Sequence, residues 1–155
     1  MPESKSANVI CFGEALWDVL PSMRSVGGAP LNVAYHLKKL GVRAWPMSGV
    51  GSDPLGEELK SQIEEWGLPS DLICSVADRE TGRSLVTVVE GEPNFEVPKD
   101  VAWDYIDVPE NWPVECQPAE ALVFGSLAQR SARNRAVLDA MFVAMPTALK
   151  VLDVN

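Results

Sequence analysis

Apolar residues along the chain follow two patterns, which alternate near both ends. Short apolar runs, typical of buried strands, lie at 9–12, 45–50, 121–124 and 149–154. Between them, apolar residues recur at helical spacing after Pro30, after Pro54 and over 132–145. Pro46 indicates that its strand lies at an edge or begins there. The alternation of strand and helix predicts an α/β fold, with a parallel sheet flanked by helices.

Two further segments are predicted to be extended but lie outside this alternation. In the first, 16–24, Leu16 and Asp18 fall on the same side of a regular strand. The second, 84–97, is rich in β-branched residues, and Gly91 can turn it back on itself. We expect the two segments to form one small antiparallel sheet beside the main one. Its exposed apolar face is expected to meet another chain.

The composition excludes several classes of protein. The 155 residues, 46% of them hydrophobic, suit a single globular domain. A net charge of -9 disfavours a nucleic-acid partner, because phosphate binding needs clustered positive charge. No apolar run approaches the roughly 20 residues of a membrane span, and residues 1–8 lack the apolar core of a secretory signal. Three cysteines without metal or redox spacing favour a reducing cytoplasm.

Acidic residues and prolines concentrate between 90 and 120. This stretch holds nine acidic side chains and a single basic one, Lys99, together with five of the 12 prolines. Such a composition predicts irregular, solvated chain that crosses the surface.

Candidate ligand-binding residues surround the start of the first helix. Gly27 and Gly28 would let the backbone approach a ligand closely, and a simple tight turn is the alternative. The helix start offers unpaired N–H groups, and Asn32 can place an amide beside them. Asp18 is either exposed on its strand or faces a ligand, because a buried, unpaired carboxylate is costly.

Three other motifs have ordinary structural explanations. Residues 51–56 have the glycine spacing of a phosphate loop, but Glu57 and Glu58 replace its lysine and hydroxyl residue and would repel a triphosphate. Asp53 is expected to cap the helix that follows it. Ser126, after a buried strand, belongs either to a turn or to a site at the carboxyl edge of the sheet.

Three glycine-containing segments carry a family signature. They read GEALWDVLP at 13–21, GGAPLNVA at 27–34 and GVGSDPLG at 49–56. Together they resemble the N-terminal half of the ribokinase-like (phosphofructokinase B type) carbohydrate kinases, and fructokinase in particular. Ribokinase itself prefers a lysine where this chain has Ala29. The resemblance runs from about residue 9 to the end of the chain.

The resemblance implies a ribokinase-like fold that transfers a phosphoryl group from ATP, with Mg²⁺, to a sugar hydroxyl. Fructose is the expected sugar. Segments 16–24 and 84–97 match a lid sheet over the sugar, which often forms a homodimer contact as well. The implied sugar-binding residues are Asp18, Gly27, Gly28, Asn32 and Ser126.

The resemblance also implies that part of the machinery lies elsewhere. In the family, the catalytic base, the anion hole and most of the ATP pocket belong to the C-terminal half, at a Gly-Ala-Gly-Asp motif that this chain lacks. We therefore expect residues 1–155 to be the N-terminal part of a sugar kinase, without a catalytic residue or metal site and inactive alone. Two alternatives stay open: a non-catalytic sugar-binding or interaction protein, and a nucleoside or keto-deoxy-sugar acid kinase of the same fold.

Overall fold

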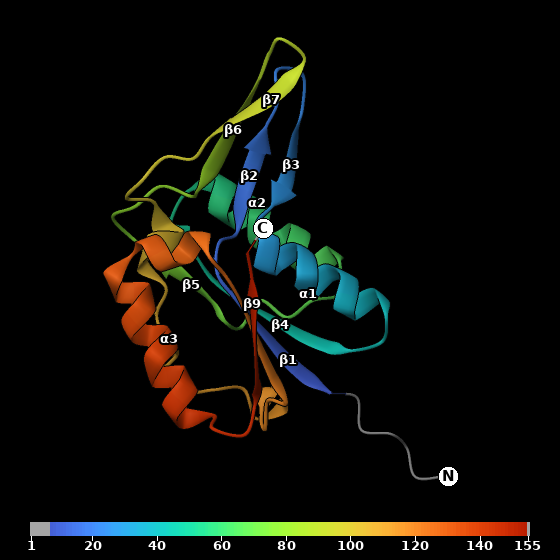
Figure 1. Ribbon diagram of the computed structural model, residues 1–155, viewed down its shortest axis with the longest axis vertical. Coiled ribbons are helices and arrows are strands. Elements are labelled where there is room, and N and C mark those ends of the chain that lie inside the picture. Colours follow the sequence, from blue (N-terminus) through green and yellow to red (C-terminus); the bar gives the residue numbers. More distant parts are fainter. Residues whose placement is uncertain (1–6, 155) are drawn as a thin grey trace.

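The computed structural model describes residues 7–154, and its main layer is a five-stranded parallel sheet (Figure 1). The strand order is β5-β4-β1-β8-β9. The strands are β1 (Asn8–Phe12), β4 (Arg43–Gly51), β5 (Ile73–Val76), β8 (Ala121–Gly125) and β9 (Leu149–Asp153). The predicted parallel α/β layer is thus confirmed, and β5 is an addition that the sequence pattern did not indicate.

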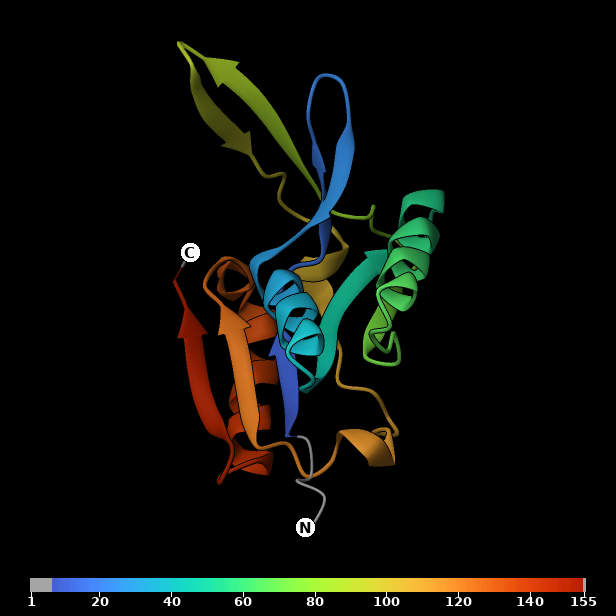
Figure 2. The ribbon, with the colours of Figure 1, turned by 90° about the vertical axis from the view of Figure 1, so that its right-hand side faces the viewer.

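Helices cover both faces of this sheet (Figure 2). Successive side chains of β1 point to opposite faces, so Val9 and Cys11 pack in one apolar cluster while Ile10 and Phe12 pack in another. The first cluster includes side chains of α1 (Ala29–Lys39) and α2 (Pro54–Glu65). The second includes α3 (Ala132–Ala144).

A second, four-stranded sheet projects beyond the carboxyl ends of the main strands (Figure 2). Its order is β3-β2-β6-β7, formed by β2 (Leu16–Val19), β3 (Arg24–Gly27), β6 (Arg83–Val89) and β7 (Glu92–Glu96). The two predicted segments do share one sheet, but it is mixed rather than antiparallel. β2 and β6 pair in parallel because both run outward from the carboxyl edge of the main sheet.

Pro46 lies inside β4, opposite Cys11 of β1. Strand β5 pairs only with residues 48–51 of β4. The other side of Pro46 therefore has no partner strand, and β4 is locally an edge at this residue, as its proline indicated.

Part of the acid- and proline-rich stretch is built into the core, so its prediction as solvated chain is wrong there. Trp103 and Ile106 are fully buried. The short 3-10 helix η1 (Ala102–Tyr105) places the buried Asp104 2.8 Å from Arg130, whose guanidinium lies 3.9 Å from the Trp103 ring centroid. The remaining acidic side chains of the stretch are exposed. The inward residues follow no regular period, so the pattern did not reveal them.

Strand β9 forms one edge of the main sheet, next to β8 alone. Leu149 and Leu152 are 65% and 52% exposed, and Val154, just after the strand, is 77% exposed. The apolar run at 149–154 does form a strand, but its place at the edge of the sheet leaves it exposed rather than buried. Within residues 7–154, no helix has the length and apolar character needed to cross a membrane.

Candidate functional site

A cavity of about 290 Å³ lies between the two sheets, at the carboxyl ends of β1, β8 and β9. The chain runs from β1 through α1 to β4 on one side, and from β8 through α3 to β9 on the other. The strand order therefore reverses between β1 and β8, and open α/β sheets bind ligands at such a point. The cavity is lined by Glu14, Leu16, Asp18, Gly28, Ala29, Asn32, Ser84, Phe95, Val97, Ser126, Leu127 and Asp153.

Four of the five predicted site residues line this cavity: Asp18, Gly28, Asn32 and Ser126. Asn32 and Ser126 are exposed, whereas Asp18 is half-buried. The fifth, Gly27, is buried behind Asp18, where an added Cβ would lie only 2.1 Å from Asp18 Oδ2. Gly27 therefore shapes the site by leaving room for the carboxylate.

Gly28 precedes α1 in a conformation that requires glycine. Its φ is +114°, and an added Cβ would lie 2.2 Å from the carbonyl oxygen of Glu14. The segment after β1 thus packs tightly against the start of α1. The glycine pair allows this close approach of backbone to backbone at the edge of the cavity.

Glu14 is a site residue to which the sequence motif assigned no role. Only 4% of its surface is exposed, and its Oε1 accepts a hydrogen bond from the Ala29 backbone N–H at 3.0 Å. Burial raises the pKa of Glu14, and the nearby Asp153 raises it further. Glu14 directly follows β1 and Gly13 in the sequence, at the carboxyl edge of the sheet. That position could have identified it as a site residue.

Ser84 is the second residue that the sequence did not single out. It lies opposite Asp18 in the parallel pairing of β2 with β6, and both residues line the cavity. Burial raises the pKa of Asp18, while the neighbouring Ser84 hydroxyl opposes that rise. The sequence analysis expected antiparallel pairing, and the residue opposite Asp18 depends on the direction of the neighbouring strand. The pairing of Asp18 with Ser84 was therefore not predicted.

The charge around the cavity is one-sided. Glu14, Asp18 and Asp153 supply three carboxylates, and no lysine or arginine is among the described lining residues. Arg130 is close enough to influence Glu14, but Asp104 binds its Nε and Nη2, each at 2.8 Å. The cavity therefore accepts hydrogen bonds from neutral hydroxylated ligands and disfavours anions.

The glycine loop before α2 does not hold a phosphate. Asp53 caps α2 by accepting a hydrogen bond from Gly56 N at 2.8 Å, and also binds Thr81 N and Oγ1 at 2.8 and 2.6 Å. Although burial opposes the effect, the bonds from Thr81 and Gly56 hold the pKa of Asp53 below its ordinary value. A carboxylate at the helix start leaves no place for a phosphate, and the predicted cap is confirmed.

The side chains described in residues 7–154 do not form a site that fits ATP or Mg²⁺. The glycine loop is closed by Asp53, and no three His, Cys, Asp or Glu side chains of this part of the chain are grouped to hold a metal ion. We therefore derive no catalytic step through either group from these residues.

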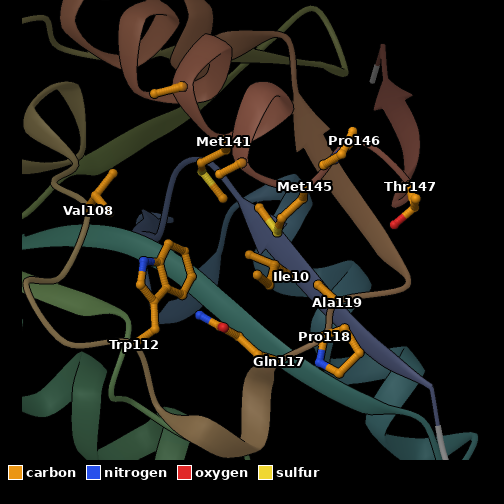
Figure 3. Close-up of a pocket in the computed structure, with 12 residues that line it drawn as sticks. Ile10, Val108, Trp112, Gln117, Pro118, Ala119, Met141, Met145, Pro146 and Thr147 are labelled. Atoms are coloured by element: carbon orange, nitrogen blue, oxygen red, sulfur yellow. The ribbon is translucent and has the colours of Figure 1, made fainter.

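A larger cavity, about 480 Å³, lies at the opposite end of the sheet (Figure 3). Trp112, Met141 and Met145 line it, close to the amino ends of β8 and β9. Its polar lining side chains are Gln117 and Thr147, and none of the lining residues is charged. This mainly apolar cavity has no charged group to bind a polar substrate strongly, whereas the smaller cavity has three carboxylates, so the smaller one is the candidate site.

Comparison with known proteins finds carbohydrate kinases among the relatives of this chain. The pfkB family carbohydrate kinase model matches residues 12–153. The chain is 30% identical over 142 residues to a sugar kinase of Pyrococcus horikoshii, covering 90% of this chain and 46% of that protein. Fructokinase-2 of Solanum habrochaites is 27% identical over 138 residues, covering 80% and 42%.

Solved structures share the fold. The crystal structure of fructokinase from Xylella fastidiosa superposes with a TM-score of 0.83 at 25% identity, covering 95% of this chain and 50% of that one. The Pyrococcus horikoshii sugar kinase, solved in complex with ATP, gives 0.79 at 25% identity, covering 95% and 53%. The chain spans about half the length of these relatives. Its matched residues and its fold show that the chain belongs to the pfkB family of carbohydrate kinases.

Proposed function

We propose that this chain forms the sugar-binding half of an ATP-dependent, fructokinase-like kinase. The observation that carries the proposal is the cavity at the switch point, where Asp18, Glu14 and Asp153 converge. Sugar hydroxyls donate hydrogen bonds, and ionised carboxylates accept them strongly. Fructose is the proposed sugar because several of the relatives are fructokinases.

The charge of the cavity separates this function from its competitors. A keto-deoxy-sugar acid or a sugar phosphate would bring a negative charge into a cavity whose described lining includes three carboxylates and no lysine or arginine. A nucleoside would need a stacking platform for its base, and the one aromatic side chain described in the lining, Phe95, is 58% exposed and offers little buried surface for stacking. A neutral sugar therefore suits the cavity best.

The second sheet is proposed to act as a lid. It contributes Asp18, Ser84 and Phe95 to the cavity and packs against the main domain through Leu16. Closure over a bound sugar would exclude water and hold the reacting hydroxyl in place. We further propose that the lid meets a second copy of the chain, since Phe95 and Met23 are 58% and 60% exposed.

ATP, Mg²⁺ and the catalytic base are proposed to bind or lie outside residues 1–155. The closed glycine loop and the acidic cavity support this division. The purified chain should therefore show no fructose-dependent turnover of ATP, as measured by ADP release in a coupled assay. Such turnover would show that residues assigned here to structure carry the chemistry. We also propose that the protein is located in the cytoplasm.

Calorimetric titration tests the proposed sugar class. Fructose should bind the chain saturably, and fructose 6-phosphate and gluconate should bind at least about 10-fold more weakly, because each carries a negative charge into the acidic cavity. Absence of saturable fructose binding, or a preference for either anion, would contradict the proposal. Light scattering after size exclusion tests the dimer, with Phe95→Ser expected to shift the chain toward monomer.

A further inference from the structure

We propose that Glu14 binds a hydroxyl group of the sugar directly through its Oε2 atom and thereby sets which hydroxyl pattern is accepted. This inference rests on the proposed function, because it requires a sugar in the cavity between the two sheets. It concerns a residue on the main sheet, opposite the Asp18–Ser84 pair on the second sheet.

The two oxygens of Glu14 have different surroundings. Oε1 accepts the hydrogen bond from Ala29 N and so helps to fix the start of α1. Oε2 is buried and has no hydrogen-bond partner among the described residues. Glu14 as a whole is 4% exposed, yet it lines the cavity. One oxygen is therefore committed to the fold, and the other is left for a ligand.

Gly125, at the carboxyl end of β8, lies beside this oxygen. A Cβ added at Gly125 would lie 3.4 Å from Glu14 Oε2, in ordinary van der Waals contact. The same Cβ would lie 3.1 Å from Pro30 Cγ, so a side chain at this position would crowd both residues. A larger side chain would cover the oxygen from the main-sheet side of the cavity.

The unpaired oxygen is unfavourable for the chain without ligand. A buried carboxylate that lacks a hydrogen-bond donor loses its hydration without replacement. Asp153, also in the lining, adds like charge, and Arg130 is already bound to Asp104. A hydroxyl donor from the ligand would remove this cost, and a bound water is the competing donor.

The rigidity of Glu14 suits it to selecting between sugars. Its carboxylate is fixed to α1 through Ala29, whereas Asp18 belongs to the projecting sheet. A site built around a buried acceptor rejects an analogue that lacks the matching hydroxyl, because the acceptor then stays unpaired. Glu14 should therefore discriminate between fructose and one of its deoxy analogues.

The variant Glu14→Gln tests this assignment. The glutamine oxygen can still accept from Ala29 N, but an NH₂ group replaces the free acceptor. Fructose affinity should fall by about 10-fold or more. The matched control is Glu57→Gln, the same chemical change on the exposed surface of α2, and it should leave the affinity unchanged. A melting curve of each variant confirms that it is folded.

Affinities for a panel of monodeoxy fructoses distinguish direct binding by Glu14 from a purely structural role. One member should bind the unmodified chain weakly and lose no further affinity in Glu14→Gln, because the contact is already absent. In parallel, the carboxyl ¹³C resonance of Glu14 in the unmodified chain should shift with fructose and not with that analogue. The second measurement needs no variant to fold.

The outcomes separate the two proposals. If the unmodified chain binds fructose, and Glu14→Gln binds it equally with no change in the Glu14 carboxyl resonance, Glu14 only holds α1 or a water, and this inference is overturned while the proposed function stands. If the unmodified chain binds no sugar, the proposed function itself fails.

Discussion

The carboxylate of Asp18 occupies the space that a side chain at Gly27 would need. Gly27 lies opposite Leu16 in the pairing of β2 with β3, and an added Cβ would come within 2.1 Å of Asp18 Oδ2. The glycine pair before α1 therefore has two separate tasks. Gly27 makes room for a carboxylate, and Gly28 allows the tight packing against Glu14.

Gly27→Ala should displace Asp18 and weaken fructose binding by about 10-fold, since the carboxylate would lose its position beside Ser84. Titration calorimetry measures the affinity. The control is Ser22→Ala, an exposed change in the turn of the same hairpin, which should bind fructose like the unmodified chain. Equal affinity of Gly27→Ala and the control would show that Asp18 can move without loss.

Asp18→Ala should weaken fructose binding more directly. A hydrogen bond to a charged group contributes roughly 1.5–3 kcal/mol, which corresponds to about a 10- to 150-fold loss of affinity. Asp139→Ala, an exposed change on α3 outside the cavity, serves as the control. In a kinase that contains this half, the same change should raise KM for fructose and spare ATP binding. Unchanged fructose affinity would remove Asp18 from the site.

Asp104→Ala should destabilise the fold by about 3 kcal/mol, because Arg130 would then remain partly buried without its partner. Asp107→Ala is the matched control: it also removes an acid from an arginine pair, with Arg133, but both side chains are at least half exposed. That change should cost roughly 0–1 kcal/mol. Urea unfolding measures both. Equal losses would mean that burial of the Arg130 pair adds nothing.

The contrast between these two acids shows what the sequence could predict. Both lie in one acidic stretch with no regular period, so nothing in the pattern separated Asp104 from Asp107. Burial around Trp103 depends on contacts with Arg130, far along the chain. Strands such as β1 and β8, and helix α3, were predicted within a residue or two because their apolar spacing is local.

The same distinction between local motifs and long-range contacts applies to the candidate site. Asp18, Gly28 and Asn32 lie in short motifs, and the cavity does bring them together. Ser84 reaches Asp18 only through the parallel pairing of β2 with β6, which no local pattern encodes. Glu14 stood within the motif, but its role depends on which of its oxygens lacks a partner in the folded chain.

Stability should depend on pH through Glu14. Burial, and then Asp153, raise the pKa of Glu14, with Arg130 opposing and Asp18 on the far side of the cavity. The folded chain thus holds this proton more tightly than the unfolded chain, so the contribution of Glu14 to stability is complete below its ordinary pKa of about 4.3 and is lost as pH rises through the raised value.

Glu14→Gln removes this titration. Its melting temperature relative to the unmodified chain should therefore increase between about pH 5 and pH 8. Differential scanning calorimetry across this range measures the difference, with Glu57→Gln as the control for a non-specific change in charge. A difference that stays constant with pH would show that burial does not affect the ionisation of Glu14.

The account rests most directly on where a sugar binds. Fructose titrated into the isotope-labelled chain, followed by backbone amide chemical shifts, should perturb residues around the cavity between the two sheets: Asp18, Gly28, Asn32, Ser84 and Ser126. The apolar cavity near Trp112 and Met145 should stay unperturbed. Saturable shifts confined to that apolar cavity, or no saturable shifts at all, would contradict the assignment of the sugar site.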